Sequence, residues 1–256
     1  MDALEAIHGL EWLYLFIILV GAAFVHGGIG MGFPLVFTAL GALVLDVKTA
    51  VFISLVPAIL INVQCLMHGL EWRALLSRFS LLAACAGLGS IAGTKILLLA
   101  PPGPIKLVLV ASIVVYLVLD RLGTGSFGWI RSHPMASAVL LGLVAGVIGG
   151  ITNAMGPVLV VYFLEQKYNT DTTVQGLNFC FLVGKLAQLY LFIDVGRYAN
   201  ASSIAPIAGI TLLVMACLLV GVYIRKRLDV STYRKALKVA LGIIAVVLLA
   251  QVVAGL

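Results

Sequence analysis

The chain has 256 residues, of which 62% are hydrophobic and 10% are charged, and its mean hydropathy is +1.18. A soluble domain of this length has too little interior to bury so much apolar surface, so the composition excludes one and predicts an all-α polytopic membrane protein. The net charge of +6 does not indicate a nucleic-acid-binding surface, because the main basic cluster, 225–238, lies between apolar segments and is a topology signal.

Eight apolar segments follow one another along the chain, separated by polar stretches. They cover residues 12–45, 48–67, 74–100, 105–120, 135–164, 173–194, 203–224 and 234–254. The first segment of each group of four is too long for one ordinary span. As a single helix, 12–45 would extend about 50 Å against a hydrocarbon core of about 30 Å.

Each long segment contains a glycine-rich break that ends in proline. The first reads HGGIGMGFP from His26 to Pro34, and the second reads GGITNAMGP from Gly149 to Pro157. Backbone that leaves the helix inside a membrane has polar groups that lipid cannot satisfy, so it must line a cavity enclosed by protein. Two such breaks in corresponding halves of a chain predict a transporter binding site.

The breaks belong to a longer internal duplication. At an offset near half the length of the chain, Thr49 matches Thr173, Ser54 matches Asn178, Gln64 matches Gln188 and Gly93 matches Gly221. We therefore divide the chain into a first repeat half, 1–122, a connecting loop, 123–134, and a second repeat half, 135–256, within one integrated membrane domain.

The basic residues favour one of two arrangements for the long segments. If both cross the membrane, the side of the 225–235 loop also holds Lys48, Lys95, Lys106 and Lys167, and Arg73, Arg78, Arg121, Arg131 and Arg197 lie opposite. If both re-enter, Arg73, Arg78, Arg121, Arg131 and Lys167 join that loop, which is the cleaner split. We predict that each half is a broken or re-entrant helical hairpin plus three transmembrane helices, with both termini outside. Because three crossings is an odd number, the halves form an inverted repeat.

The two breaks are candidate anion-binding sites. Proline is tolerated in the first turn of a helix, so we expect half-helices to begin at Phe33-Pro34 and Gly156-Pro157. Their free N–H groups and positive dipole ends favour an anion. The candidate substrate contacts in the breaks are Gly28, Gly30, Met31, Gly32, Thr152, Asn153 and Gly156. The alternative is that these glycines serve tight helix packing.

A lysine, Lys185, lies near the middle of segment 173–194 with no acidic residue close by in that segment. A charge at that depth costs roughly 2.5–3.5 kcal/mol and is normally kept for function. On a helix it shares one broad polar face with Gln175, Asn178 and Gln188. We add Asn178 and Lys185 to the substrate-binding candidates. The alternative is a lysine that snorkels or bonds to carbonyls of a broken helix.

Three further side chains, His26, Gln64 and Gln188, are candidates for contact with a proton or an anion, although a structural role for His26 ranks slightly ahead. No Asp or Glu lies in the middle of an apolar segment, which argues against a carboxylate proton relay. The sequence also has no P-loop, HExxH or GxSxG motif. We expect no enzyme activity, no catalytic residue, no metal and no cofactor.

The duplicated pattern resembles the TauE/SafE family of sulfite and organosulfonate exporters. The resemblance is carried by Gly27 to Pro34 followed by Thr49 to Ser54, and by Gly149 to Pro157 followed by Thr173 to Asn178. It covers nearly the whole chain and implies a multi-pass protein of the bacterial inner (cytoplasmic) membrane. It also implies sulfur oxyanions, sulfite first among them, as the substrate class.

From the residues and the resemblance together we predict a secondary transporter, an exporter of a small sulfur oxyanion, that works by alternating access between inverted repeats. One alternative is a thiosulfate or organosulfonate transporter with Cys180 or Cys65 in its path, and another is a membrane subunit that transports nothing. The expected partners are a small inorganic or organosulfur anion and the lipid bilayer, and no nucleic acid. A homodimer is left open.

Overall fold

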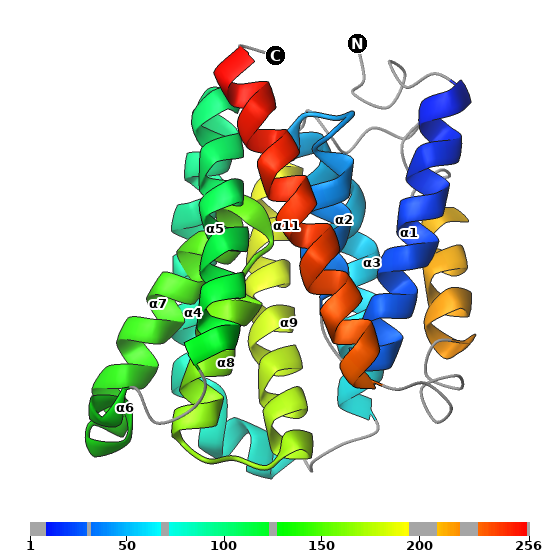
Figure 1. The fold of residues 1–256 in the computed structure, drawn as a ribbon. Coiled ribbons are helices and arrows are strands. Elements are labelled where there is room, and N and C mark those ends of the chain that lie inside the picture. Colours follow the sequence, from blue (N-terminus) through cyan, green and yellow to red (C-terminus); the bar gives the residue numbers. More distant parts are fainter. Residues whose placement is uncertain are drawn as a thin grey trace.

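The computed structural model describes residues 9–29, 32–67, 72–122, 127–194, 209–220 and 230–254, and these are almost entirely helical. The helices are α1 (Gly9–Ile29), α2 (Phe33–Gly41), α3 (Val47–Met67), α4 (Trp72–Leu99), α5 (Pro102–Leu122), α6 (Gly128–Ser132), α7 (Pro134–Thr152), α8 (Gly156–Glu165), α9 (Thr170–Asp194) and α11 (Val230–Ala254). Residues Gly209–Val220 form a further helix. Most of the helices run between the same two ends of one bundle (Figure 1). The all-α prediction is confirmed.

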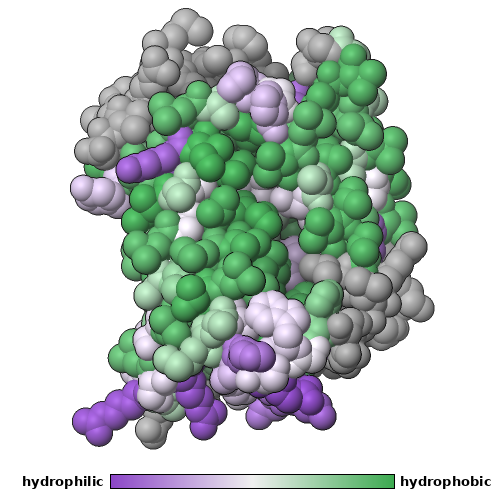
Figure 2. Space-filling model, turned by 90° about the vertical axis from the view of Figure 1, so that its left-hand side faces the viewer, coloured by the Kyte–Doolittle hydropathy of each residue, from purple (hydrophilic) through white to green (hydrophobic). Residues whose placement is uncertain are grey.

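The length and the surface of the bundle fit a membrane. Four helices, α3, α4, α7 and α9, are long and apolar enough to cross one. Side chains exposed on the flank of α4, α5 and α7 are apolar, as at Leu88, Val114 and Leu143. Figure 2 shows this flank as a hydrophobic belt, with most of the strongly hydrophilic side chains along its lower edge and fewer near its upper end. The chain is therefore a multi-pass membrane protein, as the composition predicts.

Four cationic side chains are exposed at one end of the bundle. Arg73, Arg78, Arg131 and Lys167 are exposed where α4 and α9 begin and where α6 lies, which is the lower end in Figure 1. We call this the cationic end. The start of α1 and the end of α11 lie at the opposite end (Figure 1). These four cations are among those that the re-entrant arrangement places on one side.

Helices α1 and α2 form an antiparallel hairpin. The hydroxyl of Tyr14, early in α1, donates to the carbonyl of Leu40 at the end of α2 over 3.0 Å. The amide of Phe33, the first residue of α2, donates to Nδ1 of His26 near the end of α1 over 3.5 Å. The chain therefore turns back at the first break and returns toward the end of the bundle from which it came.

Helices α7 and α8 form a second hairpin, and α6 closes its open end. The Nε and Nη2 atoms of Arg131 donate to the carbonyl of Glu165 over 3.1 and 2.9 Å, and Nε2 of Gln166 donates to the carbonyl of Ile130 over 2.9 Å. This hairpin opens toward the cationic end, whereas α1–α2 opens toward the opposite end (Figure 1). The prediction of a broken hairpin in each half, with helix starts at Phe33 and Gly156, is confirmed.

Glycines bring the backbones of α4 and α7 into close contact. A Cβ placed on Gly93 would lie 2.2 Å from the carbonyl oxygen of Val147, and one on Gly146 would lie 2.1 Å from that of Ala86. Gly150 is equally tight, since its Cβ would lie 2.6 Å from the carbonyl oxygen of Ser90. Small residues spaced four apart permit such packing in membranes. For Gly150, in the second break, the structure thus supports the packing role that the sequence left as an alternative.

Replacement of Gly146 by alanine should destabilise the bundle by about 1–3 kcal/mol, because the added methyl group must push α7 away from α4. The midpoint of thermal unfolding in detergent measures the effect. Gly21→Ala is the matched control, since a Cβ at Gly21 meets nothing within 4 Å. Equal midpoints for the two variants would contradict the close-packed interface.

Candidate functional site

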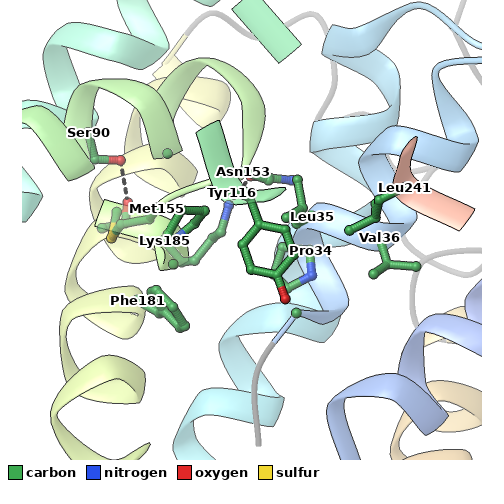
Figure 3. Close-up of a pocket in the computed structure, with 15 residues that line it drawn as sticks. Pro34, Leu35, Val36, Ser90, Tyr116, Asn153, Met155, Phe181, Lys185 and Leu241 are labelled. Atoms are coloured by element: carbon green, nitrogen blue, oxygen red, sulfur yellow. Dashed lines mark hydrogen bonds between the residues drawn. The ribbon is translucent and has the colours of Figure 1, made fainter. Parts of the chain in front are cut away.

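A cavity lies where the two helix breaks meet (Figure 3). The start of α2 contributes Gly32 and Pro34, and the start of α8 contributes Gly156 and Pro157. Asn153 and Lys185 add polar groups, and the rest of the wall is largely apolar, formed by Leu35, Val36, Tyr116, Met155, Phe181 and Leu241 among others. The cavity volume of about 50 Å³ leaves room for a ligand of a few non-hydrogen atoms.

Among the residues that the structure describes, each break contains one with a left-handed backbone. Gly32, directly before α2, has φ 109°, and Asn153, directly after α7, has φ 63°. Glycine adopts this conformation freely, and asparagine is one of the few other residues that tolerate it. No side chain caps the N-terminus of α2 or α8 from its N-cap residue. Both half-helices thus bring positive dipole ends to the wall of the cavity.

The side chain of Asn153 joins the second break to three other helices. Its Nδ2 donates to Oγ1 of Thr38 in α2 over 2.7 Å and to Oγ of Ser54 in α3 over 2.9 Å. Because the Ser54 hydroxyl itself donates to the carbonyl of Val51, its lone pairs are free to accept from the amide. This fixes the orientation of the amide, and its Oδ1 accepts a hydrogen bond from Nζ of Lys185.

Lys185, on α9, is only 6% exposed and holds its ammonium group at the cavity. Besides Asn153, it donates to Oε1 of Gln188 over 2.7 Å. Gln188 is in turn positioned by its Nε2, which donates to the carbonyl of Gly150 over 3.0 Å. Neither partner of the ammonium is a carboxylate, and an ammonium has three N–H donors. A protonated Lys185 therefore gives the site a positive charge and one remaining N–H to offer a ligand.

The structure brings together part of the predicted set. Gly32, Asn153, Gly156 and Lys185 line the cavity, whereas Thr152, Asn178, His26, Gln64 and Gln188 do not. Gly28 lies in the last turn of α1, and Gly30 and Met31 are outside the described residues. The hydroxyl of Thr152 donates to the carbonyl of Ile148 over 2.9 Å, and its oxygen lies 3.4 Å from Oγ of Ser112. Nδ2 of Asn178 donates within α9, to the carbonyl of Val174.

The predicted polar face of α9 is buried, but only Lys185 of its four members reaches the cavity. The cysteines do not line it either. Cys180 is buried in an apolar cluster with Phe79 and Phe163, and the Cys65 sulfur lies 3.7 Å from Nε2 of His26, behind the first break. Among the residues the structure describes, no group of three His, Cys, Asp or Glu side chains is placed to hold a metal ion.

Sequence reasoning missed Thr38 and the apolar wall. Thr38 follows Pro34 by one helical turn, so a search for polar residues on the same face of the expected half-helix would have found it. Ser90 of α4 also lines the cavity, where its hydroxyl donates to the carbonyl of Gly184 in α9 over 2.8 Å. Tyr116 and Leu241 come from α5 and α11, and no local pattern marks them.

A family model described as "Sulfite exporter TauE/SafE" matches residues 15–248 of the chain. The matched range includes both hairpin breaks and every residue named above in the wall of the cavity. No curated protein and no solved structure matches the chain.

Gln188→Leu should lower the free energy of unfolding by about 1–3 kcal/mol, because Lys185 loses an acceptor and the carbonyl of Gly150 loses its donor. Thermal unfolding in detergent measures this loss. In the double variant with Lys185→Met, the cost of the second change should shrink, since no buried charge is left to satisfy. Strictly additive effects would show that Gln188 does not support Lys185.

Proposed function

The chain belongs to the TauE/SafE sulfite exporter family, and from this we propose that it is a secondary transporter that moves a small sulfur oxyanion, sulfite first, out of the cytoplasm. One observation carries the proposal. The Lys185 ammonium, buried and without a carboxylate partner, faces the same cavity as the N-termini of two half-helices. A buried charge of this kind marks a substrate pathway in membrane proteins.

An oxyanion suits the groups that surround the cavity. Its oxygens are acceptors, and the site offers the remaining N–H of Lys185 and the first-turn backbone of α2 and α8. Hydrogen bonds to a charged acceptor are shorter and about twice as strong as neutral ones. The apolar wall lowers the local dielectric and strengthens each of them further. The substrate-binding role is proposed for Gly32, Asn153, Gly156 and Lys185.

The packing of the helices supports alternating access between inverted repeats. Helix α5 of the first half packs against α8 of the second, and α11 of the second half packs against α2 of the first. Helices α3 and α9, which the duplication matches to each other, also pack together. Exchanged contacts of this kind fit two halves related by a pseudo-two-fold axis, as in an inverted repeat. Movement about the cavity would then expose it first to one end and then to the other.

The membrane potential can drive such an exporter without ATP. Applying the positive-inside rule, we propose that the cationic end faces the cytoplasm of a bacterial cell, with the start of α1 and the end of α11 on the outer side of the inner membrane. With a negative interior, each exported negative charge gains about 2.3 kcal/mol per 100 mV. The cysteine-based alternative has no support from the cavity wall, because neither Cys65 nor Cys180 belongs to it.

Lys185→Met and Asn153→Ala should each abolish the sulfite-induced rise in melting temperature and the sulfite-dependent current of proteoliposomes on a solid-supported membrane. The first removes the charge, and the second removes the group that positions it. Lys95→Met is the matched control, because Lys95 is exposed on α4 away from the cavity. Unchanged binding and transport by both site variants would refute this site.

A thermal-shift screen of the wild-type protein tests the alternative of a non-transporting subunit. A protein whose melting temperature responds to none of sulfite, sulfate, thiosulfate, sulfoacetate and taurine would favour that alternative.

Sulfite efflux from proteoliposomes should be electrogenic and should accelerate when the interior is made negative with a potassium gradient and valinomycin. The release of sulfite from vesicles with a uniform protein orientation measures the rate. A rate that ignores the potential would contradict export driven by the membrane potential and would indicate transport coupled to a compensating ion.

A further inference from the structure

Buried polar side chains continue beyond the cavity along the interface between α3 and α9. Asn62 of α3 is 1% exposed and Gln175 of α9 is 8% exposed. Nε2 of Gln175 donates to the carbonyl of Cys65 over 2.9 Å, so its side chain reaches α3. Asn62 lies three residues before Cys65 and therefore on the same side of that helix. Both amides thus belong to the part of the α3–α9 interface where Gln175 reaches α3.

This pair of amides lies between the cavity and the cationic end. Helix α9 begins at that end, and Gln175 is close to its start. Lys185 is ten residues further along, which is about 15 Å of helix. Asn62 is likewise close to the end of α3, which connects through a short loop to the start of α4. Near the first break, Nε2 of His26 lies 3.7 Å from the sulfur of Cys65. His26 therefore adds a third buried polar side chain beside Asn62 and Gln175.

Each amide has one polar atom without a partner. These atoms are Nδ2 of Asn62, a donor, and Oε1 of Gln175, an acceptor. Unpaired polar atoms are rare in protein interiors and costly to keep, so each needs an explanation such as water or a ligand. In a membrane protein the cost is harder to avoid, because lipid offers no alternative partner. Leucine would fill much the same space without that cost.

We propose that this interface is the closed cytoplasmic half of the transport path. The anion moves between the Lys185 cavity and the cationic end by separating α3 from α9, and Asn62 and Gln175 solvate it on the way. An unpaired donor together with an unpaired acceptor matches a hydrated oxyanion, whose oxygens accept and whose waters donate. The inference rests on the proposed function of the cavity, and it adds the route by which the cavity is reached.

Asn62→Leu and Gln175→Leu test the route separately from the site. Each variant should keep the sulfite-induced thermal shift of the wild type, because neither residue lines the cavity. Sulfite transport in proteoliposomes should slow about ten-fold or more, since the anion loses a hydrogen-bonding group in passage. Asn62→Ser, which retains a polar group, should restore part of the rate. Thr94→Val is the matched control, because the Thr94 hydroxyl is also buried and unpaired but lies on α4 beside Gly150.

The outcomes separate the route from the proposed function. Slow transport with intact sulfite binding in the leucine variants, and a normal rate in Thr94→Val, supports the route. A folded Asn62→Leu or Gln175→Leu protein that transports within about twofold of the wild type overturns it, because the lost hydrogen bond predicts a larger effect. If neither leucine variant folds, the amides are structural and the route fails. Absence of sulfite binding by the wild type refutes the function of the cavity instead.

Discussion

The hydrogen bond from Lys185 to Asn153 joins the two constraints on which this structure depends. A charge buried in a membrane protein needs polar partners, and so does backbone that leaves the helix at that depth. Asn153 meets both needs, because its left-handed backbone ends α7 while its side chain holds the ammonium. Its two hydroxyl partners, Thr38 and Ser54, come from the first half of the chain. The second break is therefore held in place by the half to which it does not belong.

Much of the fold could be predicted from the sequence, because lipid permits few solutions. Apolar segments of known length must be helices, and a segment such as 12–45, too long for one crossing, had to break at its glycines and proline. The site was harder to predict. A helical face identified Lys185 together with Asn178, but Asn178 lies outside the cavity wall and its Nδ2 donates to the carbonyl of Val174 in its own helix. Tyr116 and Leu241 meet the cavity only through tertiary packing, which no local pattern contains.

The glycines near the breaks have two different roles that sequence alone does not separate. Gly32 is needed for its backbone angle, since φ 109° is unfavourable for a side-chain-bearing residue. Gly150 has an ordinary helical backbone and is needed for the absence of a side chain, because the backbone of α4 passes directly against it. Both kinds lie in one stretch of sequence, so a count of glycines overstates the size of the ligand site.

The contact between α4 and α7 also determines which parts of the protein can move together. It attaches the second hairpin to a helix of the first half, and α6 clamps the far end of that hairpin through Arg131. On the other side, Val214 and Leu218 of the second half pack into the cluster of α1 and α2. Each hairpin thus packs against a helix from the other half of the chain. The two halves of the chain are interleaved, and a cut in the connecting loop would not separate them into self-contained bodies.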